Sequence, residues 1–591
     1  MTGSVAWMLP LPVLVPLLSA GLTLVVGRRP RLQQAISTTA LIVSLVVGVF
    51  LVVGAAGGPL ALDVGSWSAP IGVTLVADKL SALMLVVSQV VCLAVLLYSI
   101  AQNVADSSAS APVAIYHPTF LILVAGVSNA FLTGDLFNLY VGFEILLAAS
   151  FVLITLGGTR GRIRAGSVYV VVSLVSSLIF LTAIALIYGA LGTVNMAQLS
   201  ERIRDLDPNV ALLLQLMLLV AFGIKAAIFP LYAWLPDSYP TAPAPVTAVF
   251  AGLLTKVGIY AIIRLQFLLF PENPLTVLLA IAGIATMLLG IVGAVAQDDI
   301  KRLLSFTLVS HIGYMVWGIS LATVAGLAAA IYYAAHHIIV QTALFLIVGL
   351  IERRTGTTSS RRLNNLARLT PILAIMYLIS GLNLVGVPPF SGFIGKLGLA
   401  EASVQVGTPI AWALLAAGMV TSFLTLYVVI KFWNRAFWQP PKAHTELAEM
   451  YRNRAGRLSG REERRLQRAI QADQRTGQSH RLADTARTEA ERGGGQSSVI
   501  MSWVVVGLIV VQLGMAFFGG PIYGYAEAAA KELKVRTPYV TAVLGDVGRG
   551  EGISNTVSTP ILMPWEQGPQ RIPYAPLGDI KLPEVGGESE G

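Results

Sequence analysis

Apolar stretches recur along the chain at the length typical of membrane-spanning helices. At 1.5 Å per residue, about twenty residues cross the ~30 Å hydrocarbon core of a bilayer. We count about fourteen such stretches, near 7–27, 35–57, 79–101, 117–133, 135–157, 166–189, 210–230, 244–268, 275–296, 303–320, 324–350, 371–404, 409–433 and 499–518. The pattern predicts an all-α polytopic membrane protein with about 14 transmembrane helices.

The polar residues between these stretches differ in charge from one side of the membrane to the other. With the N-terminus outside, the cytoplasmic connections carry Arg28, Arg29, Arg31, Arg160, Arg162, Arg164, Arg353, Arg354, Arg361, Arg362 and Arg368. The opposite connections carry Asp63 or a mixed set within 201–207. Because positive residues favour the inside, we expect a multi-pass membrane protein with both termini extracytoplasmic.

Composition agrees with this assignment. Hydrophobic residues make up 55% of the chain and charged residues 12%, with a mean hydropathy of +0.74. A soluble protein of this length would carry far more charge. The net charge of +9 is explained by orientation in the membrane, so we expect the lipid bilayer and no nucleic acid as partner. The single cysteine, Cys92, excludes an internal disulfide.

Composition and spacing divide the chain into six predicted segments. These are 1–112 with spans one to three, 113–270 and 271–437 with five spans each, a cytoplasmic Arg-rich insert at 438–497, a last span at 498–520, and an extracytoplasmic tail at 521–591. We expect the insert to form a solvated helix near anionic headgroups followed by a flexible linker. Apart from a short helix near 524–536, the tail is predicted to be irregular.

Prolines and glycines interrupt two of the stretches. One reads AFGIKAAIFPLYAWLPDSYP and the other NLVGVPPFSGFIGKLGLA. Proline removes an amide donor, and opened backbone at membrane depth needs protein or water to satisfy it. If 113–270 and 271–437 are two inverted five-helix repeats, each break lies in the fourth helix of its repeat, which is typical of a transporter's working site. The alternative is two unrelated proline kinks.

Ionisable residues inside the spans form the candidate site. They are Glu144, Lys225, Lys256, His336, His337 and Lys396. Each mid-membrane charge costs on the order of 2.5–3.5 kcal/mol. Three lysines and one glutamate do not balance, so buried ion pairs that only lock helices together leave amines unexplained. Burial disfavours the charged form of an amine, so these lysines can take up and release protons near neutral pH.

The remaining ionisable residues in or near the spans are more ambiguous. Adjacent helical positions point about 100° apart, so at most one of His336 and His337 is expected to line a path, with a slight preference for His336. His311 fits helix packing and a water path equally well. Asp78 and Asp135 lie near span ends and fit interfacial charges or helix caps. Asp237 follows the first break and fits a cytoplasmic entrance.

Four long motifs in order resemble a known family. They are GDLFNLYVGFEILLAASFVLITLGG, KAAIFPLYAWLPDSYPTAPAPVTAVFAGLLTKVGIYA, DDIKRLLSFTLVSHIGYM and GVPPFSGFIGKL. Together they resemble the antiporter-like proton-translocating subunits shared by respiratory complex I and Mrp-type multisubunit Na+/H+ antiporters, and the form around Glu144 looks most like the D subunit of the latter. The resemblance implies a glutamate–lysine pair, Glu144 with Lys225, and a path through Lys256 and His336 or His337 to Lys396. Family members often carry a lysine where this chain has Gln341, so the path is either shorter here or bridged by water at that step.

We therefore expect a proton-translocating subunit of a multisubunit monovalent cation (Na+)/H+ antiporter: a secondary transporter subunit rather than an enzyme. Expected partners are the other small and large membrane subunits of the complex, with protons and monovalent cations as its ions. No cofactor or metal site is expected, since the chain shows no Cys ligand set, Rossmann fingerprint or P-loop. The alternative is a proton-pumping membrane subunit of an NADH–quinone or hydrogenase-type oxidoreductase, which co-purified flavin and iron–sulfur proteins would favour.

Overall fold

The computed structural model describes residues 5–27, 29–102, 113–272, 275–439 and 495–545. Up to the first helix break its α-helices are α1 (Leu11–Val25), α2 (Pro30–Ala55), α3 (Lys79–Gln102), α4 (Val113–Leu132), α5 (Leu136–Thr155), α6 (Arg160–Leu191), α7 (Met196–Arg202) and α8 (Pro208–Ala226). Beyond it are α9 (Leu235–Ser238), α10 (Ala244–Val249), α11 (Thr255–Arg264), α12 (Thr276–Val295), α13 (Ile300–Ser320), α14 (Val324–Thr355), α15 (Leu366–Leu369), α16 (Pro371–Val385), α17 (Ser391–Val406), α18 (Pro409–Trp433), α22 (Gly495–Phe517), α23 (Gly519–Val535) and α24 (Thr537–Leu544). The polytopic helical fold predicted from the sequence is confirmed.

Thirteen helices of the described residues are long and apolar enough to cross a membrane. The predicted stretch that is missing from this set is 371–404, because its break divides it into α16 and α17, each shorter than a full span. The expected count of about fourteen therefore differs only at the helix predicted to be interrupted. The inverted relation of the two five-helix segments, and the division of the chain into six segments, stay predictions.

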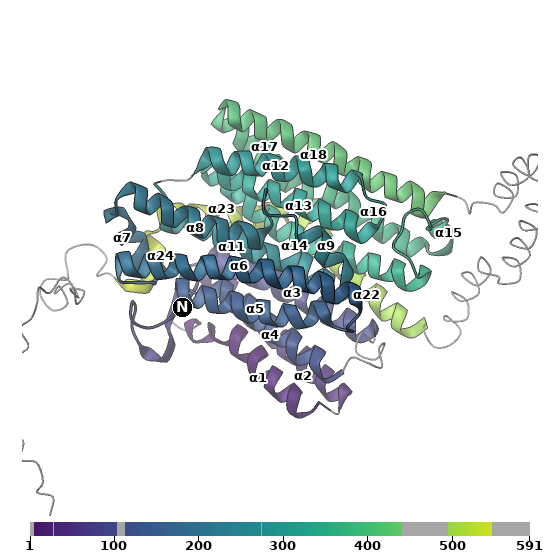
Figure 1. Ribbon diagram of the computed structural model, residues 1–591, viewed down its shortest axis with the longest axis horizontal. Helices are drawn as coiled ribbons and strands as arrows, with labels where there is room; N and C mark the ends of the chain where they lie inside the picture. Colours follow the sequence, from purple (N-terminus) through teal and green to yellow (C-terminus); the bar gives the residue numbers. More distant parts are fainter. Residues whose placement is uncertain (1–4, 28, 103–112, 273–274, 440–494, 546–591) are drawn as a thin grey trace, which may run out of the picture. The chain divides into compact units, whose positions relative to one another are not determined.

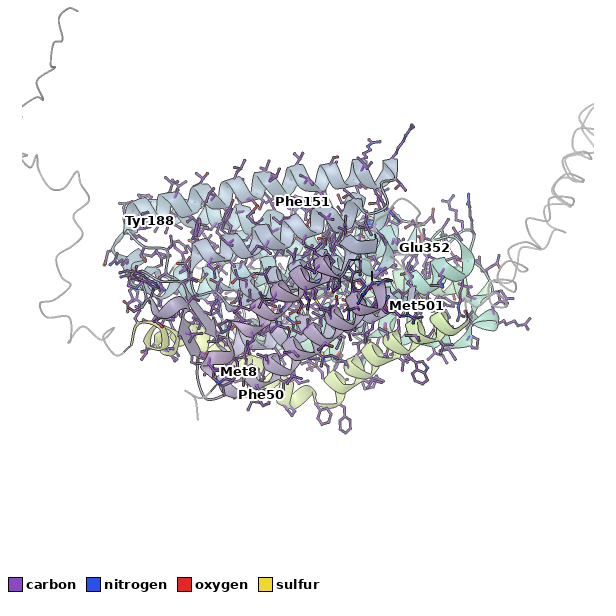
Figure 2. The ribbon with its side chains drawn as sticks, turned by 90° about the horizontal axis from the view of Figure 1, so that it is seen from below. Met8, Phe50, Phe151, Tyr188, Glu352 and Met501 are labelled. Carbon is purple, nitrogen blue, oxygen red and sulfur yellow. The ribbon has the colours of Figure 1, made fainter. Side chains whose placement is uncertain are left out.

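The helices run alongside one another, with α1 and α2 at one edge of the bundle and α17 and α18 at the opposite edge (Figure 1). Figure 2 shows Met8, Phe50 and Tyr188 toward one end of the bundle, and Glu352 and Met501 toward the other. Since Tyr188 lies near the end of α6 and Phe50 near the end of α2, the basic starts of these two helices share the end that carries Glu352. The basic connections expected on one side of the membrane thus lie together.

Two helical segments form the centre of the bundle. In α14 every residue from Gly326 to Ile351 is buried, and the helix contacts α3, α10, α13, α16, α17, α22 and α23. The second segment runs continuously from α10 through a π-helical turn, η6 (Phe250–Leu254), into α11 and a second π-helical turn, η7 (Leu265–Leu269). A helix that is apolar on all sides is expected to be buried on all sides. These two helices carry Lys256 and the two candidate histidines.

Both predicted helix breaks are present. The first half-helix, α8, ends at Ala226, and Ala227 adopts a left-handed conformation with φ of 58°. The chain resumes as α9 and a short 3-10 turn, η5 (Tyr239–Thr241). The second break lies between α16 and α17, where Gly386 has φ of 84°. Both first halves therefore end at a left-handed residue, which terminates the helix and leaves carbonyl groups free to accept hydrogen bonds.

A small β-hairpin was not expected from the hydrophobic pattern. Strand β1 (Leu60–Asp63) pairs antiparallel with β2 (Thr74–Ala77), with Leu60 opposite Ala77 and Asp63 opposite Thr74. Leu60, Leu75 and Ala77 of the hairpin belong to a separate buried cluster with residues of α2, α3 and α4. The hairpin therefore covers the end of the first three spans that lies away from the basic connections.

The C-terminal region contains more helix than the sequence predicted. The helix expected near 524–536 is the longer α23, and α24 follows it, so the prediction of an otherwise irregular tail is wrong for 537–544. The α23 helix contacts α3 and α14, and its Glu532 forms an ion pair with Lys79 at the start of α3. The predicted solvated helix and linker of the insert, at 440–494, and the tail from 546 onward lie outside the described residues.

A buried ion pair between Asp78 and Arg264 joins the start of α3 to the end of α11. The Arg264 guanidinium lies 2.6 Å from the Asp78 carboxylate, and the two side chains are only 3% and 2% exposed. Asp78 also accepts a hydrogen bond from the backbone amide of Ser81, as a helix cap does. Burial raises the pKa of Asp78, but the charge of Arg264 and its hydrogen bonds outweigh burial and hold the pKa below its ordinary value.

Replacing Asp78 by Asn is expected to destabilise the protein by about 3–5 kcal/mol, because it leaves the Arg264 guanidinium buried without a counter-charge. Thermal unfolding of the purified, assembled protein, followed by tryptophan fluorescence, measures the change. The matched control is Glu272→Gln, since the Glu272–Arg204 pair is exposed and is expected to contribute less than about 1 kcal/mol. Equal unfolding temperatures for the two variants would contradict a structural role for the buried pair.

Candidate functional site

The six candidate residues lie on five helices that meet in the interior of the bundle. Glu144 is on α5, Lys225 is in the last turn of α8, and Lys256 is in the first turn of α11. His336 and His337 lie midway along α14, and Lys396 is in the second turn of α17. Glu144 and Lys396 are half-buried, and the other four side chains of this set are buried.

Glu144 and Lys225 are joined through a serine rather than directly. The Lys225 Nζ atom donates to the Ser177 hydroxyl at 3.1 Å, and that hydroxyl donates to a carboxylate oxygen of Glu144. The ammonium group also lies 4.8 Å from the centre of the Phe143 ring. Ser177, on α6, therefore bridges the two residues of the predicted pair by hydrogen bonds. A hydroxyl that accepts on one side and donates on the other can pass a proton between its two neighbours.

Lys256 has no carboxylate partner among the described residues. Its Nζ atom donates to the backbone carbonyl of Ala251 at 2.6 Å, within the π-helical turn that precedes it. Widened turns of this kind are frequent at functional sites. Gly258, two residues further along, packs so closely against α8 that an added Cβ would lie 2.8 Å from the backbone nitrogen of Ala226. This close approach brings the helix of Lys256 against the end of the helix of Lys225.

The two adjacent histidines face different neighbours. His336 forms a 2.9 Å hydrogen bond between its Nδ1 atom and the Ser391 hydroxyl, at the second helix break. His337 stacks on His311 with ring centres 5.3 Å apart. The structure thus places one imidazole beside the break and the other against His311.

Lys396 is held by the carbonyl groups that the second break frees. Its Nζ atom donates to the Val385 carbonyl at 2.8 Å and to the Ser422 hydroxyl at 3.0 Å. Gly386 is required here, because its φ is positive and a Cβ would lie 2.9 Å from the Lys396 side chain. Lys225 precedes its break and Lys396 follows its own, yet each ammonium group lies near the C-terminal end of a first half-helix.

Several participants were missed or left open by the sequence. His311 hydrogen-bonds through Nδ1 to the Tyr333 hydroxyl at 2.6 Å, so it belongs to the histidine cluster. The Tyr314 hydroxyl lies 2.8 Å from the Ser422 hydroxyl, and its ring lies 4.6 Å from Lys396 Nζ. The one signal that could have found these groups is the presence of hydroxyl side chains in the middle of apolar spans, as in the Ser176–Ser177 pair. That signal is weak, since serine and tyrosine are common in such spans.

Buried polar atoms without a hydrogen-bonding partner occur at the candidate residues and close to them in the sequence. Among the described residues these include both ring nitrogens of His337, Nε2 of His336, the Thr255 hydroxyl and the side-chain oxygen of Gln341. Buried polar groups of this kind are the ones that internal water molecules satisfy. Gln341 donates to the Leu304 carbonyl at 2.8 Å. The arrangement supplies amines, imidazoles and hydroxyls in series, which suits proton transfer.

Two cavities adjoin the first break. The larger, about 660 Å³, lies at the end of the bundle that carries Glu352, and it is lined by both acidic and basic side chains. Asp237 lines it and pairs with Arg302 at 2.9 Å, while Glu352 pairs with Lys301 at 2.7 Å. The smaller cavity, about 20 Å³, is lined by Lys225. In the part of the chain that the structure describes, no group of three or more His, Cys, Asp or Glu side chains is arranged to hold a metal ion.

Comparison with known proteins places these features in context. Residues 133–425, which contain all six candidate residues, match the family described as "NADH:quinone oxidoreductase/Mrp antiporter, TM". The D subunit of the Na(+)/H(+) antiporter of Alkalihalophilus pseudofirmus is 41% identical over 442 residues, which cover 74% of this chain and 88% of the relative. A chain in the structure of the Mrp complex from Dietzia sp. DQ12-45-1b superposes with a TM-score of 0.78 at 32% identity, covering 92% of this chain and 100% of that chain.

Respiratory complex I from Thermus thermophilus contains a chain with the same fold. Its TM-score is 0.67 at 24% identity, over 89% of this chain and 99% of that chain, and at this identity the likeness concerns the fold alone. Sequence identity over nearly the whole length of a relative is the stronger finding, and the chain accordingly belongs to the family of the Na(+)/H(+) antiporter D subunits.

Proposed function

We propose that the chain is the proton-translocating subunit of a multisubunit monovalent cation (Na+)/H+ antiporter. Its protons would move along Glu144, Lys225, Lys256, the histidines of α14 and Lys396. The family assignment and the buried series of titratable side chains support this function together. The observation that carries it is the hydrogen-bonded chain from Lys225 through Ser177 to Glu144, since it offers a physical switch for the proton affinity of a buried amine.

The switch follows from electrostatics. A carboxylate close to an amine favours its protonated form, whereas burial in low dielectric favours the neutral form. Glu144 already acts electrostatically on Lys225, and Ser177 stands between them. A small movement that separates Glu144 from this serine would release the proton of Lys225 into the interior. The reverse movement would draw a proton back.

Beyond Lys225 the proposed path runs through Lys256 to the histidine cluster. Within that cluster His337 stacks on His311, and His311 is hydrogen-bonded to Tyr333. The Tyr333 ring lies 5.4 Å from the His336 ring, and Lys396 completes the series at the second break. Water molecules at the unpartnered nitrogens would join the steps that lack a direct contact.

The proposal also covers the partner subunits, the exchanged cation and the orientation of the chain in the membrane. Relatives of this chain are subunits of Mrp complexes by name, so we assign other membrane subunits of such a complex as partners and Na+ as the exchanged cation. The Arg-rich connections gather at one end of the bundle, and we place that end in the cytoplasm of a bacterium with both termini outside the inner membrane. A redox-driven complex is less favoured, because the likeness to complex I is one of fold, whereas the likeness to antiporter subunits extends to sequence.

Replacing Lys225 by Ala is expected to abolish Na+/H+ antiport while the complex still assembles, because the switchable amine is removed. Dequenching of a pH-sensitive dye in inverted membrane vesicles after Na+ addition measures the exchange, and co-purification of the partner subunits measures assembly. Antiport at the wild-type rate in an assembled Lys225→Ala complex would overturn the proposed function.

Ser177 offers a subtler test with a neighbour as control. Ser177→Ala removes the bridge and is expected to lower the antiport rate by about tenfold or more, the change that about 1.4 kcal/mol in a barrier produces. Ser176→Ala is matched to it, because Ser176 donates only to the Ala221 carbonyl and does not contact the pair. If both serine variants exchange ions at the same rate, Ser177 is not part of the switch.

A further inference from the structure

One short segment separates the two cavities at the first break. Trp234 and Tyr239 line the small cavity that holds Lys225, while Pro240 and Thr241 line the large cavity at the end of the bundle. The segment between α8 and α10 is therefore a wall with one face towards each space. A proton that enters through the large cavity must pass this wall before it reaches Lys225.

Tyr239 is a residue of this wall that bears a hydroxyl group and lines the small cavity. Its side chain is fully buried, and its hydroxyl has no hydrogen-bonding partner among the described residues. The other tyrosine of that cavity, Tyr169, differs in that its hydroxyl lies 2.9 Å from the Ser150 hydroxyl. Burial without a partner is unfavourable for a hydroxyl. The Tyr239 hydroxyl is therefore available to a group inside the cavity.

The packing around Tyr239 fixes where its ring lies. Trp234 contacts it edge to face with ring centres 5.5 Å apart, and Phe250 lies at 5.6 Å. Its backbone carbonyl accepts a 2.9 Å hydrogen bond from Thr247 of α10. The ring thus closes the small cavity on one side, and Lys225 lies on another. About 20 Å³ is room for one water molecule.

We propose that Tyr239 is the proton-transfer residue between the large cavity and Lys225, acting through one water molecule in the small cavity. This proposal rests on the proposed function and names the cytoplasmic end of its path. When Lys225 is protonated from the large cavity, the Tyr239 hydroxyl gives its proton to the cavity water as its oxygen takes one from a hydronium ion of the large cavity, reached by a small shift of the η5 turn; proton release to the large cavity reverses each step. The cavity water passes its proton to the neutral amine of Lys225. Each O–H or N–H bond formed matches one broken, so no other reactant is needed.

Tyr239→Phe tests the transfer while it keeps the ring. The expected result is a fall of at least ~10-fold in antiport in inverted vesicles, with normal assembly, since a positioned proton-transfer group contributes this much or more. Tyr116→Phe is the control, because Tyr116 is also a buried tyrosine but lies on α4 and lines neither cavity. Wild-type exchange in Tyr239→Phe beside an inactive Lys225→Ala would overturn the role of Tyr239 and leave the proposed function intact. Wild-type exchange in both would overturn both.

Thiol labelling tests the wall without measuring transport. The sole cysteine, Cys92, is buried and is first replaced by Ala. Ser173→Cys then reports on the small cavity and Thr241→Cys on the large one. In the assembled complex a water-soluble thiol reagent should label Thr241→Cys readily and Ser173→Cys slowly, as read by mass spectrometry of this chain. Adding Tyr239→Ala should raise the labelling rate of Ser173→Cys at least ~10-fold. Adding Tyr116→Ala should leave that rate unchanged. An unchanged labelling rate with Tyr239→Ala would show that Tyr239 does not separate the cavities.

Discussion

An amine buried among apolar helices must find oxygen atoms inside the protein, and this constraint organises the core. Lys225 takes a serine hydroxyl, Lys256 takes a backbone carbonyl of a π-helical turn, and Lys396 takes the last carbonyls of a broken helix. Such oxygens satisfy the hydrogen bonds of an ammonium group but do not neutralise its charge. The proposed relay requires that the proton on each amine can leave, which a full buried ion pair would prevent.

The same constraint explains why the helix irregularities and the lysines occur together. A regular helix offers no free carbonyls in the middle of a bilayer, because each is bonded within its own helix. The first halves of the two broken helices end at Ala226 and Val385, just before the left-handed residues Ala227 and Gly386, and the end of the second presents its final carbonyls to Lys396. Lys396 uses them directly, whereas Lys225 lies in the last turn itself. The π-helical turn before Lys256 meets the same need in an otherwise continuous helix. Each of these three irregularities is thus next to one of the three lysines.

Much of this could be predicted from the sequence. Ionisable residues within apolar stretches stand out individually, and Pro and Gly mark a break without knowledge of the neighbouring helices. The hydrogen-bonding partners of these residues could not be predicted, because they depend on which helices pack against one another. Nothing local distinguishes Ser177, which bridges Glu144 and Lys225, from Ser176, which bonds its neighbour's backbone. The hairpin at 60–77 was hidden for a similar reason, since short strands between spans have no helical period to reveal them.

The histidines show the same limit. Helical geometry correctly implied that His336 and His337 point in different directions, and from this a single path residue was expected. Because α14 is surrounded on all sides, both directions lead to titratable or hydroxyl groups: Ser391 for His336 and His311 for His337. A preference between two adjacent residues assumes a helix with one functional face, and a central helix has no such restriction.

Lys256 is where a proton relay and a purely structural bundle differ most sharply, because it is fully buried and no described carboxylate pairs with it. The decisive measurement is Na+/H+ antiport by the purified complex in proteoliposomes with Lys256→Gln, together with its thermal unfolding. A relay through Lys256 predicts that exchange is lost while the unfolding temperature is unchanged or higher, since a buried amine has been removed. Exchange at the wild-type rate with a lower unfolding temperature would contradict the relay and leave Lys256 with a structural role alone.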